Sequence, residues 1–237
     1  MSLDASLLAW FGQNGRALPW RKTRDPYAVL VSEVMLQQTQ VDRVVPRYLE
    51  WLERWPTVEG LAAASPADVI RAWQGLGYNR RALNLHRAAR IVAERGWPDD
   101  LTNLPGVGRY TADAVRAFAF GAPVLPEDTN VRRVLERTGH RFGPTCGQAL
   151  MDLGATVCIA RIPRCELCPL ADACPSRGQR YEPLRKQSRF EGSFRERRAR
   201  ALRAVAAGEQ PDDPDAVAAL ARDGLVELRA GLVALPE

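Results

Sequence analysis

The sequence predicts an all-α protein, and three observations support that fold class. Apolar residues recur at helical spacing, as Leu30 and Val34 do within a long apolar stretch. Helix-start signals are frequent, the clearest being Ser65 followed by Pro66. No strand-like alternation of useful length occurs before residue 225. We therefore expect helices packed on helices over most of the chain.

The N-terminal part divides into helices separated by glycine and proline. Apolar residues at 3–11 favour an amphipathic helix that ends near Gly12 and Gly15. A second helix is expected to open after Asp25-Pro26 and to run from Tyr27 to Val41. Further helices are expected at 43–54, 57–64, 66–74 and 79–95.

The stretch Leu104 to Gly108, Leu-Pro-Gly-Val-Gly, predicts a tight turn between two helices. Pro105 fixes φ, while Gly106 and Gly108 permit the positive φ that such a turn needs. Backbone N–H groups around Leu104, Gly106, Val107 and Gly108, with the positive end of the next helix dipole, suit a phosphate oxygen. The same turn, taken alone, is equally a plain connection between helices.

The last third contains helices after Asn130 and from Gly147 to Cys158, then two shorter helices at 195–207 and 214–223. A hairpin is expected from 225–228 and 232–235, which fits a small winged-helix-like fragment. Nine basic and three acidic residues lie between Ser176 and Arg200. Such a run is either a solvated face or a contact with phosphate groups.

Composition limits the class of protein. A length of 237 residues suits one large domain or two small ones, and the net charge of +5 is compatible with a polyanionic partner. No apolar run approaches the ~18 residues of a membrane span, and the first residues lack a secretory signal. We expect a cytoplasmic protein that does not bind membranes.

Four cysteines form the most specific spacing in the chain: Cys158, Cys165, Cys168 and Cys174. A disulfide framework is not expected without a secretory signal. Four thiolates so close in sequence can surround one tetrahedral centre, and the spacing alone allows zinc or a 4Fe-4S cluster. Cys146 lies outside the pattern and is expected to be a small buried residue.

Glu33 lies within the apolar stripe of the second helix, between Val31 and Val34. A buried carboxylate is unfavourable unless it is paired or functional, so Glu33 is a candidate site residue. The alternative is that Glu33 faces water beside Ser32 and Gln37.

The ten residues from Ser32 to Val41, Ser-Glu-Val-Met-Leu-Gln-Gln-Thr-Gln-Val, are similar to the first motif of MutY-type adenine DNA glycosylases. The Leu104–Gly108 turn followed by Asp128 resembles the helix-hairpin-helix (HhH-GPD, endonuclease III-like) superfamily that contains them. The cysteine spacing, with Ala149–Ala155 before it, resembles the iron-sulfur loop of the same enzymes. The resemblance covers roughly residues 5–180 and favours a 4Fe-4S cluster over zinc.

This resemblance implies a fold of two lobes. A six-helix barrel lobe with the helix-hairpin-helix would span 23–127, and an iron-sulfur cluster lobe would combine 1–22 with 128–180. Residues 181–237 would form a basic linker and the winged-helix-like tail. The expected partner is double-stranded DNA with a mispaired or damaged base, the expected location is the nucleoid, and a monomer is expected.

The resemblance also implies roles for individual residues. Glu33 matches the general acid, Asp128 the catalytic aspartate, and Asn130 an asparagine that orients sugar and water. Further residues match positions at the DNA: Gln37 or Gln38 in the base stack, Tyr78 at the inserted strand, and Arg161 and Arg164 on the cluster loop.

The chemistry requires two carboxyl groups in opposite protonation states. We expect burial to raise the pKa of Glu33, which would protonate adenine N7, while ionised Asp128 faces the anomeric carbon. Asp128 would stabilise the oxocarbenium ion or bond to it covalently. The base must first leave the duplex, at an energetic cost that DNA contacts offset.

Strand cleavage is not expected. In endonuclease III-type lyases a lysine that forms a Schiff base occupies the position of Tyr110. Here the only lysines are Lys22 and Lys186, and arginine cannot act as the amine nucleophile. The sequence therefore predicts a monofunctional glycosylase.

Two departures from the family leave alternatives open. The residues after the cysteines are too few for the NUDIX-like domain that reads 8-oxoguanine in full-length MutY-type enzymes, and Glu127 adds a carboxylate beside Asp128. A uracil or thymine mismatch glycosylase acting opposite guanine is the first alternative, although N7 protonation is a purine requirement. A non-catalytic lesion-binding protein is the second.

Overall fold

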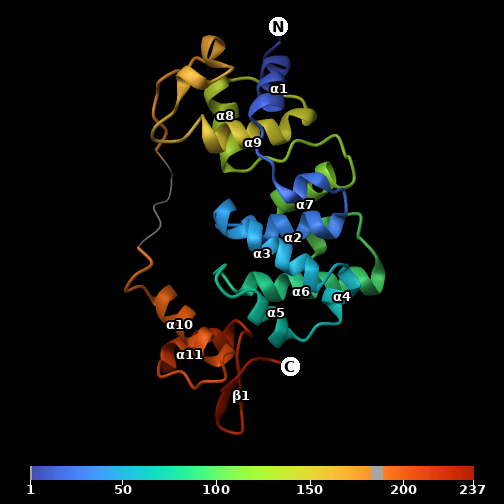
Figure 1. Cartoon of the computed structure of the whole chain (residues 1–237), viewed down its shortest axis with the longest axis vertical. Coiled ribbons are helices and arrows are strands. Elements are labelled where there is room, and N and C mark those ends of the chain that lie inside the picture. The colour runs from blue at the N-terminus through green and yellow to red at the C-terminus, as the bar shows by residue number, and fades with distance from the viewer. Residues whose placement is uncertain (1, 183–188) are drawn as a thin grey trace. The chain divides into compact units, whose positions relative to one another are not determined.

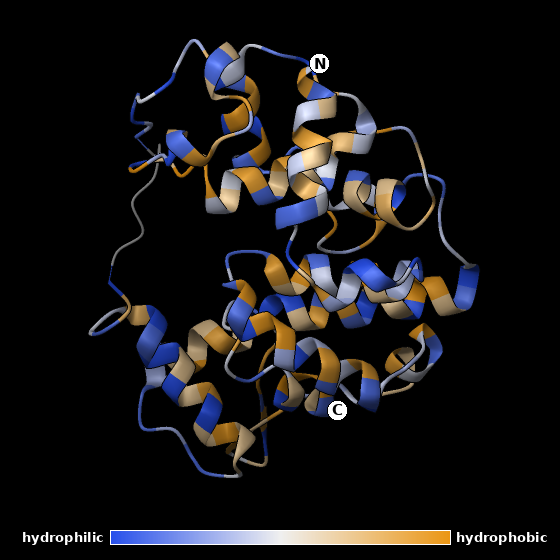
Figure 2. Cartoon of the chain, turned by 45° about the horizontal axis from the view of Figure 1, so that its top comes forward, coloured by the Kyte–Doolittle hydropathy of each residue, from blue (hydrophilic) through white to orange (hydrophobic). Residues whose placement is uncertain are grey.

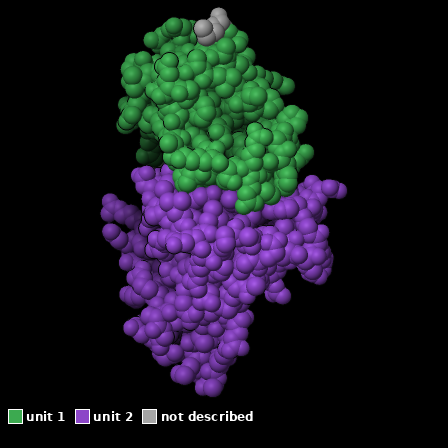
Figure 3. Space-filling model, turned by 45° about the vertical axis from the view of Figure 1, so that its right-hand side comes forward, with its two compact units in different colours: residues 1–26, 109–186 green, residues 27–108, 187–237 purple. Residues whose placement is uncertain are grey.

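The computed structural model describes residues 2–182 and 189–237, and these are mainly helical, as predicted. Figure 1 shows these helices along the chain, and Figure 3 shows the two compact units into which the described residues divide. The described residues of unit 1 lie within 1–26 and 109–186, and the described residues of unit 2 lie within 27–108 and 187–237. Arg185 and Lys186 of the predicted basic run lie outside the described residues.

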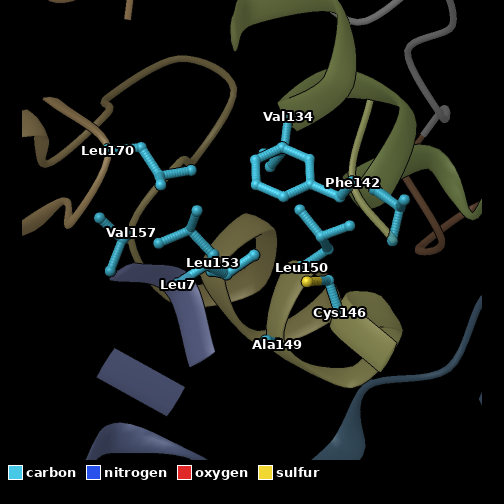
Figure 4. Close-up of a cluster of buried hydrophobic side chains, with 10 residues drawn as sticks. Leu7, Val134, Phe142, Cys146, Ala149, Leu150, Leu153, Val157 and Leu170 are labelled. Carbon is cyan, nitrogen blue, oxygen red and sulfur yellow. The ribbon is translucent and has the colours of Figure 1, made fainter. Parts of the chain in front are cut away.

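The described residues of unit 1 form four α-helices, three of which surround one apolar core. The helices are α1 (Leu3–Asn14), α7 (Arg109–Phe118), α8 (Thr129–Thr138) and α9 (Gly147–Thr156). Short 3-10 turns complete it: η1 (Pro19–Lys22), η3 (Pro144–Cys146), η4 (Cys165–Leu167) and η5 (Ala171–Ala173). Leu7 from α1, Val134 from α8 and Leu153 from α9 meet in this core (Figure 4).

Unit 2 contains the remaining helices of the N-terminal part. These are α2 (Pro26–Leu36), α3 (Val41–Arg54), α4 (Val58–Ala62), α5 (Pro66–Ala72), α6 (Arg80–Arg95) and the 3-10 turn η2 (Leu101–Asn103). Both α4 and α5 pack against α6. Most of these helices carry both hydrophilic and hydrophobic residues (Figure 2). The helix α2 differs, because its residues from Tyr27 to Met35 are all buried. A helix made almost entirely of apolar residues belongs in a protein interior.

The C-terminal residues also belong to unit 2. They form α10 (Phe194–Ala206), α11 (Pro214–Arg222) and an antiparallel hairpin of β1 (Glu227–Arg229) and β2 (Leu232–Ala234). Leu202 of α10 is fully buried in a cluster that includes Ile70 of α5 and Leu83 of α6. The predicted tail is thus packed onto the helices of unit 2, where the sequence indicated a separate segment. Residues 109–127, expected with the six-helix lobe, fall in unit 1.

One helix boundary differs clearly from the prediction. The helix expected to continue to Val41 ends at Leu36, and the chain turns at Gln38, which has a φ of 59°. The last carbonyl groups of α2 are bound by the side chain of Arg81, a residue distant in sequence, so the turn is fixed by a tertiary contact. In the part of the chain that the structure describes, no helix has the length and apolarity required to cross a bilayer.

Candidate active site

Glu33 is buried in α2, with 5% of its surface exposed. Its neighbours Ser32 and Val34 are also buried, and the Ser32 hydroxyl donates to the Val29 carbonyl oxygen at 2.8 Å. The prediction that Glu33 lies in the apolar interior is confirmed, and the water-facing alternative is wrong. Burial in low dielectric favours the neutral form of a carboxylic acid.

Asp128 is the N-cap residue of α8. Its Oδ1 accepts a hydrogen bond from the Val131 backbone N–H at 2.6 Å, and its Oδ2 accepts one from Asn130 Nδ2 at 3.2 Å. The side chain is half-buried, whereas Glu127 is exposed. A helix N-terminus stabilises a negative charge, so this position suits an ionised carboxylate held in one orientation.

Arg133 connects Asn130 to the next helix and to the first cysteine. Its Nη2 donates to Asn130 Oδ1 at 2.8 Å and to the Gly154 carbonyl oxygen at 2.7 Å, and its Nε donates to the Cys158 carbonyl oxygen at 2.8 Å. A Cβ atom at Gly154 would lie 2.7 Å from Asn130 Cβ, so glycine permits this close approach of α8 and α9. The orientation of Asn130 therefore depends on a buried arginine.

The four predicted cysteine ligands line one pocket of unit 1. Apolar side chains of Val134, Leu153, Val157 and Leu170 surround the thiols of Cys158, Cys165, Cys168 and Cys174. Burial raises the pKa of the Cys168 thiol to about 11, so a thiolate there needs a metal centre to stabilise it. Within residues 2–182 and 189–237, no three His, Cys, Asp or Glu side chains are gathered closely enough for a single metal ion.

Arg137 lies against the same pocket and is 5% exposed. Its Nη2 donates to the carbonyl oxygens of Ser176, at 3.3 Å, and Gln179. Its Nη1 is buried without a hydrogen-bond acceptor among the described residues. Cys146 lies outside this pocket and is fully buried, as expected for a small core residue.

The residues predicted to enter the DNA stack lie on two turns of unit 2. Gln37 is half-buried and Gln38 exposed, in the turn after α2. Tyr78 is 40% exposed and has a φ of 47°, so simple core packing does not explain it. Both turns contact the guanidinium of Arg81.

The turn at Leu104–Gly108 has the predicted positive φ at Gly106 but not at Gly108, and it offers fewer free amides than expected. Gly106 has a φ of 77°, and a Cβ atom there would lie 2.8 Å from Asn84 Cβ. The Leu104 and Val107 side chains are buried, and their N–H groups donate to the carbonyl oxygens of Leu101 and Leu104. These two amides are already used inside the turn. The exposed Gly106 and Gly108 remain candidates for phosphate contact.

The remaining predicted site residues lie in unit 1. Arg161 and Arg164 are exposed on the cysteine loop, and Tyr110 is half-buried near the start of α7. Unit 1 thus holds Asp128, Asn130, Tyr110, the four cysteines and the two loop arginines, and unit 2 holds Glu33, Gln37, Gln38, Tyr78 and the Leu104–Gly108 turn.

Sequence reasoning missed the buried charged groups that organise these residues. Asp152 is fully buried and accepts hydrogen bonds from Arg16 and Arg21, while Arg81 and Arg133 bind carbonyl groups. Helical spacing contained the signal: Arg81 lies on one stripe with Leu85, Ala88 and Val92, all of them buried.

Comparison with known proteins identifies relatives over most of the chain. Residues 31–144 match the family model of the HhH-GPD superfamily base excision DNA repair protein. The chain is 43% identical to an adenine DNA glycosylase of Mycobacterium tuberculosis, over 88% of this chain and 80% of that protein. It is 41% identical to the adenine DNA glycosylase of Homo sapiens, over 75% of this chain and 39% of that longer protein.

Solved structures agree with this relationship. A thermostable thymine-DNA glycosylase matches with a TM-score of 0.65 and 28% identity, over 72% of this chain and 93% of its own. A trapped endonuclease III–DNA covalent intermediate matches with a TM-score of 0.62 over 72% of this chain and 92% of its own. Its 24% identity supports the fold alone. The chain belongs to the adenine DNA glycosylases of the HhH-GPD superfamily of base excision DNA repair proteins.

Proposed function

We propose that this chain is a monofunctional DNA glycosylase that releases adenine mispaired with guanine or 8-oxoguanine in double-stranded DNA. The observation that carries the proposal is the burial of Glu33 within the motif shared with adenine glycosylases. Pyrimidines have no N7, so a sheltered acid that can protonate N7 favours a purine as the leaving base. The similarity to curated adenine DNA glycosylases supports the same assignment.

The proposed reaction uses two carboxyl groups in different environments. Neutral Glu33 donates its proton to adenine N7, which makes the base a better leaving group. Ionised Asp128, held by the Val131 N–H and by Asn130, stabilises the positive charge that develops on the sugar. Asn130, fixed by Arg133, orients the sugar and the attacking water.

The cysteine pocket fits a 4Fe-4S cluster held by Cys158, Cys165, Cys168 and Cys174. The buried Nη1 of Arg137 supports this proposal, because a guanidinium N–H without an acceptor suits an anionic acceptor such as a metal-bound cysteine thiolate. When bound, the cluster supplies structural support to the loop that carries Arg161 and Arg164.

The proposal also includes the residues that contact DNA. Gly106 and Gly108, with the start of α7, bind phosphate through backbone amides, and Arg161 and Arg164 add positive charge. Gln37 or Gln38 and Tyr78 fill the space that the everted adenine leaves. Tyr110 stands where a lyase would have its lysine, so no Schiff base forms. The protein acts as a monomer.

Base release under single-turnover conditions tests the assignment. Duplexes would carry one A:8-oxoG, A:G, U:G or T:G pair, and we expect release only from the two that contain adenine. Glu33→Gln should reduce that release by about 100-fold or more, because a general acid contributes roughly that factor. Release from U:G or T:G alone would contradict the adenine assignment.

Two further measurements address the cofactor and the lyase chemistry. Cys168→Ser should lower the iron content of the purified protein, whereas Cys146→Ser, which changes a cysteine outside the pocket, should not. Equal iron content in both variants would contradict the cluster site. Borohydride should trap no covalent protein–DNA adduct, and a stoichiometric adduct would show that a lyase step occurs.

A further inference from the structure

Arg81 has an unusual environment for an arginine. It lies in the first turn of α6, is 9% exposed, and has its guanidinium in unit 2 beside two turns of the backbone. Its Nη1 donates to the carbonyl oxygens of Val34 (2.7 Å), Met35 (3.1 Å) and Gln37 (2.6 Å). Its Nη2 donates to the carbonyl oxygens of Leu76 (3.2 Å) and Gly77 (2.9 Å) and to Thr39 Oγ1 (3.0 Å).

These acceptors explain why an arginine is buried here. The final carbonyl groups of a helix lack partners within the helix, and they form the negative end of its dipole. A guanidinium offers five N–H donors in a planar fork, enough to reach both turns, whereas a lysine ammonium offers three from a single atom. The charge remains solvated by protein oxygens, which offsets the cost of its burial.

The two turns that Arg81 joins are both strained. Gln38 has a φ of 59° and Tyr78 a φ of 47°, values that residues other than glycine rarely adopt. Such residues persist only where the surrounding structure holds them in place. The guanidinium also lies 5.6 Å from the Tyr78 ring centroid and 5.2 Å from the Trp73 ring centroid, and Trp73 Nε1 donates to the Gly77 carbonyl oxygen at 3.1 Å.

We propose that Arg81 is a positioning residue that fastens the Gln37–Thr39 turn and the Gly77–Tyr78 turn into one rigid DNA-facing edge. This inference rests on the proposed function, in which the same turns occupy the stack after adenine leaves. A rigid edge inserts without first losing conformational freedom, so more of its contact energy offsets the cost of opening the duplex. Arg81 itself touches neither the base nor the sugar in this scheme.

The experiment compares two DNA substrates with the same target. One is a fully paired duplex with a central A:8-oxoG pair, and the other has that pair flanked on both sides by mismatches that already open the stack. Single-turnover adenine release would be measured for wild type, Arg81→Met and Arg81→Lys. Arg80→Met is the matched control, because Arg80 is an adjacent arginine whose side chain is 67% exposed.

We expect Arg81→Met to slow release from the paired duplex by about 100-fold and from the opened substrate by less than about 3-fold, since only the first requires the base stack to be opened. Arg81→Lys should be intermediate on the paired duplex, and Arg80→Met should resemble wild type on both. Thr39→Val, which keeps the guanidinium and removes one of its acceptors, should cause a smaller loss that is again confined to the paired duplex.

Equal losses on the two substrates, or no loss on either, would overturn the inference. If circular dichroism shows that Arg81→Met is unfolded, Arg81→Lys and Thr39→Val replace it. A loss of rate confined to the paired duplex then supports the inference, and equal losses on both substrates overturn it. If wild type releases adenine from neither substrate, the proposed function fails; if wild type is active and the variants show no preference, only the role of Arg81 fails.

Discussion

Each unit contains a buried arginine that binds backbone carbonyl groups, and the two arginines differ in what else they hold. Arg133 in unit 1 also binds Asn130, which in turn donates to Asp128. Arg81 in unit 2 binds strained backbone on both sides and the Thr39 hydroxyl. The same guanidinium chemistry thus holds the asparagine that donates to Asp128 in one unit and shapes the backbone in the other.

This difference leads to different expectations for substitutions in the two units. Changes around Asp128 should slow the breaking of the glycosidic bond on both the paired and the opened substrate, because in the proposed reaction they alter the group that faces the developing charge. Substitutions of Arg81 or its acceptors should slow adenine release only from the fully paired duplex, in which the base stack must still be opened. The paired and opened substrates separate these two effects, and the predictions below use the same pair.

The largest effect is expected for Asp128→Asn. Asparagine is also a good N-cap residue, so α8 should keep its start while the negative charge is lost. Adenine release should fall by roughly 1000-fold on both the paired and the opened substrate, since electrostatic stabilisation of the transition state is removed. Binding to a duplex with a non-cleavable adenine analogue should change little, as gel-shift titration can check. A loss of binding equal to the loss of rate would refute the catalytic role.

Arg133→Met should have the next largest effect. It removes the donor that holds Asn130 and leaves the carbonyl oxygens of Gly154 and Cys158 without this partner. We expect adenine release to fall by about 100-fold, equally on the two substrates, with a stability loss of about 3 kcal/mol. Single-turnover rates and urea unfolding would measure the two effects.

Arg132→Met, at the exposed neighbouring position, is the control. A loss confined to the paired duplex would mean that Arg133 acts as Arg81 does.

Local sequence signals predicted much of what lies within single elements. The apolar neighbours of Glu33 predicted its burial, although Ser32 and Gln37 left a water-facing position open. The structure decides for burial, because α2 is buried from Tyr27 to Met35. Proline and glycine predicted the turn after Leu104, since only certain backbone angles suit those residues. The close spacing of Cys165 and Cys168 predicted that they share a pocket.

Contacts between distant segments explain what the sequence left unpredicted. The end of α2 at Leu36 depends on Arg81, which lies in another helix. The amides of Leu104 and Val107 are used inside their own turn, although the pattern indicated that they were free. The packing of Leu202 onto unit 2 depends on apolar surfaces of α5 and α6 that no local pattern relates to it. Such tertiary contacts override local propensity.

A third effect depends on pH and tests the difference between carbonyl and carboxylate partners of the buried arginines. Arg81 and Arg133 bind groups that do not titrate, whereas Arg16 and Arg21 bind the Asp152 carboxylate. Burial tends to raise the pKa of Asp152, but hydrogen bonds from Arg21 and Arg16 outweigh it, and the pKa lies below the ordinary 3.8. A lowered carboxyl pKa contributes stability that is present above the ordinary pKa and is lost as pH falls through the pKa of the folded state.

Asp152→Asn should therefore cost about 3 kcal/mol at pH 7 and progressively less below pH ~4, as urea unfolding can measure. Asp99→Asn, at an exposed position, should follow wild type throughout. A constant difference between Asp152→Asn and wild type at all pH values would mean that the carboxylate charge does not stabilise unit 1.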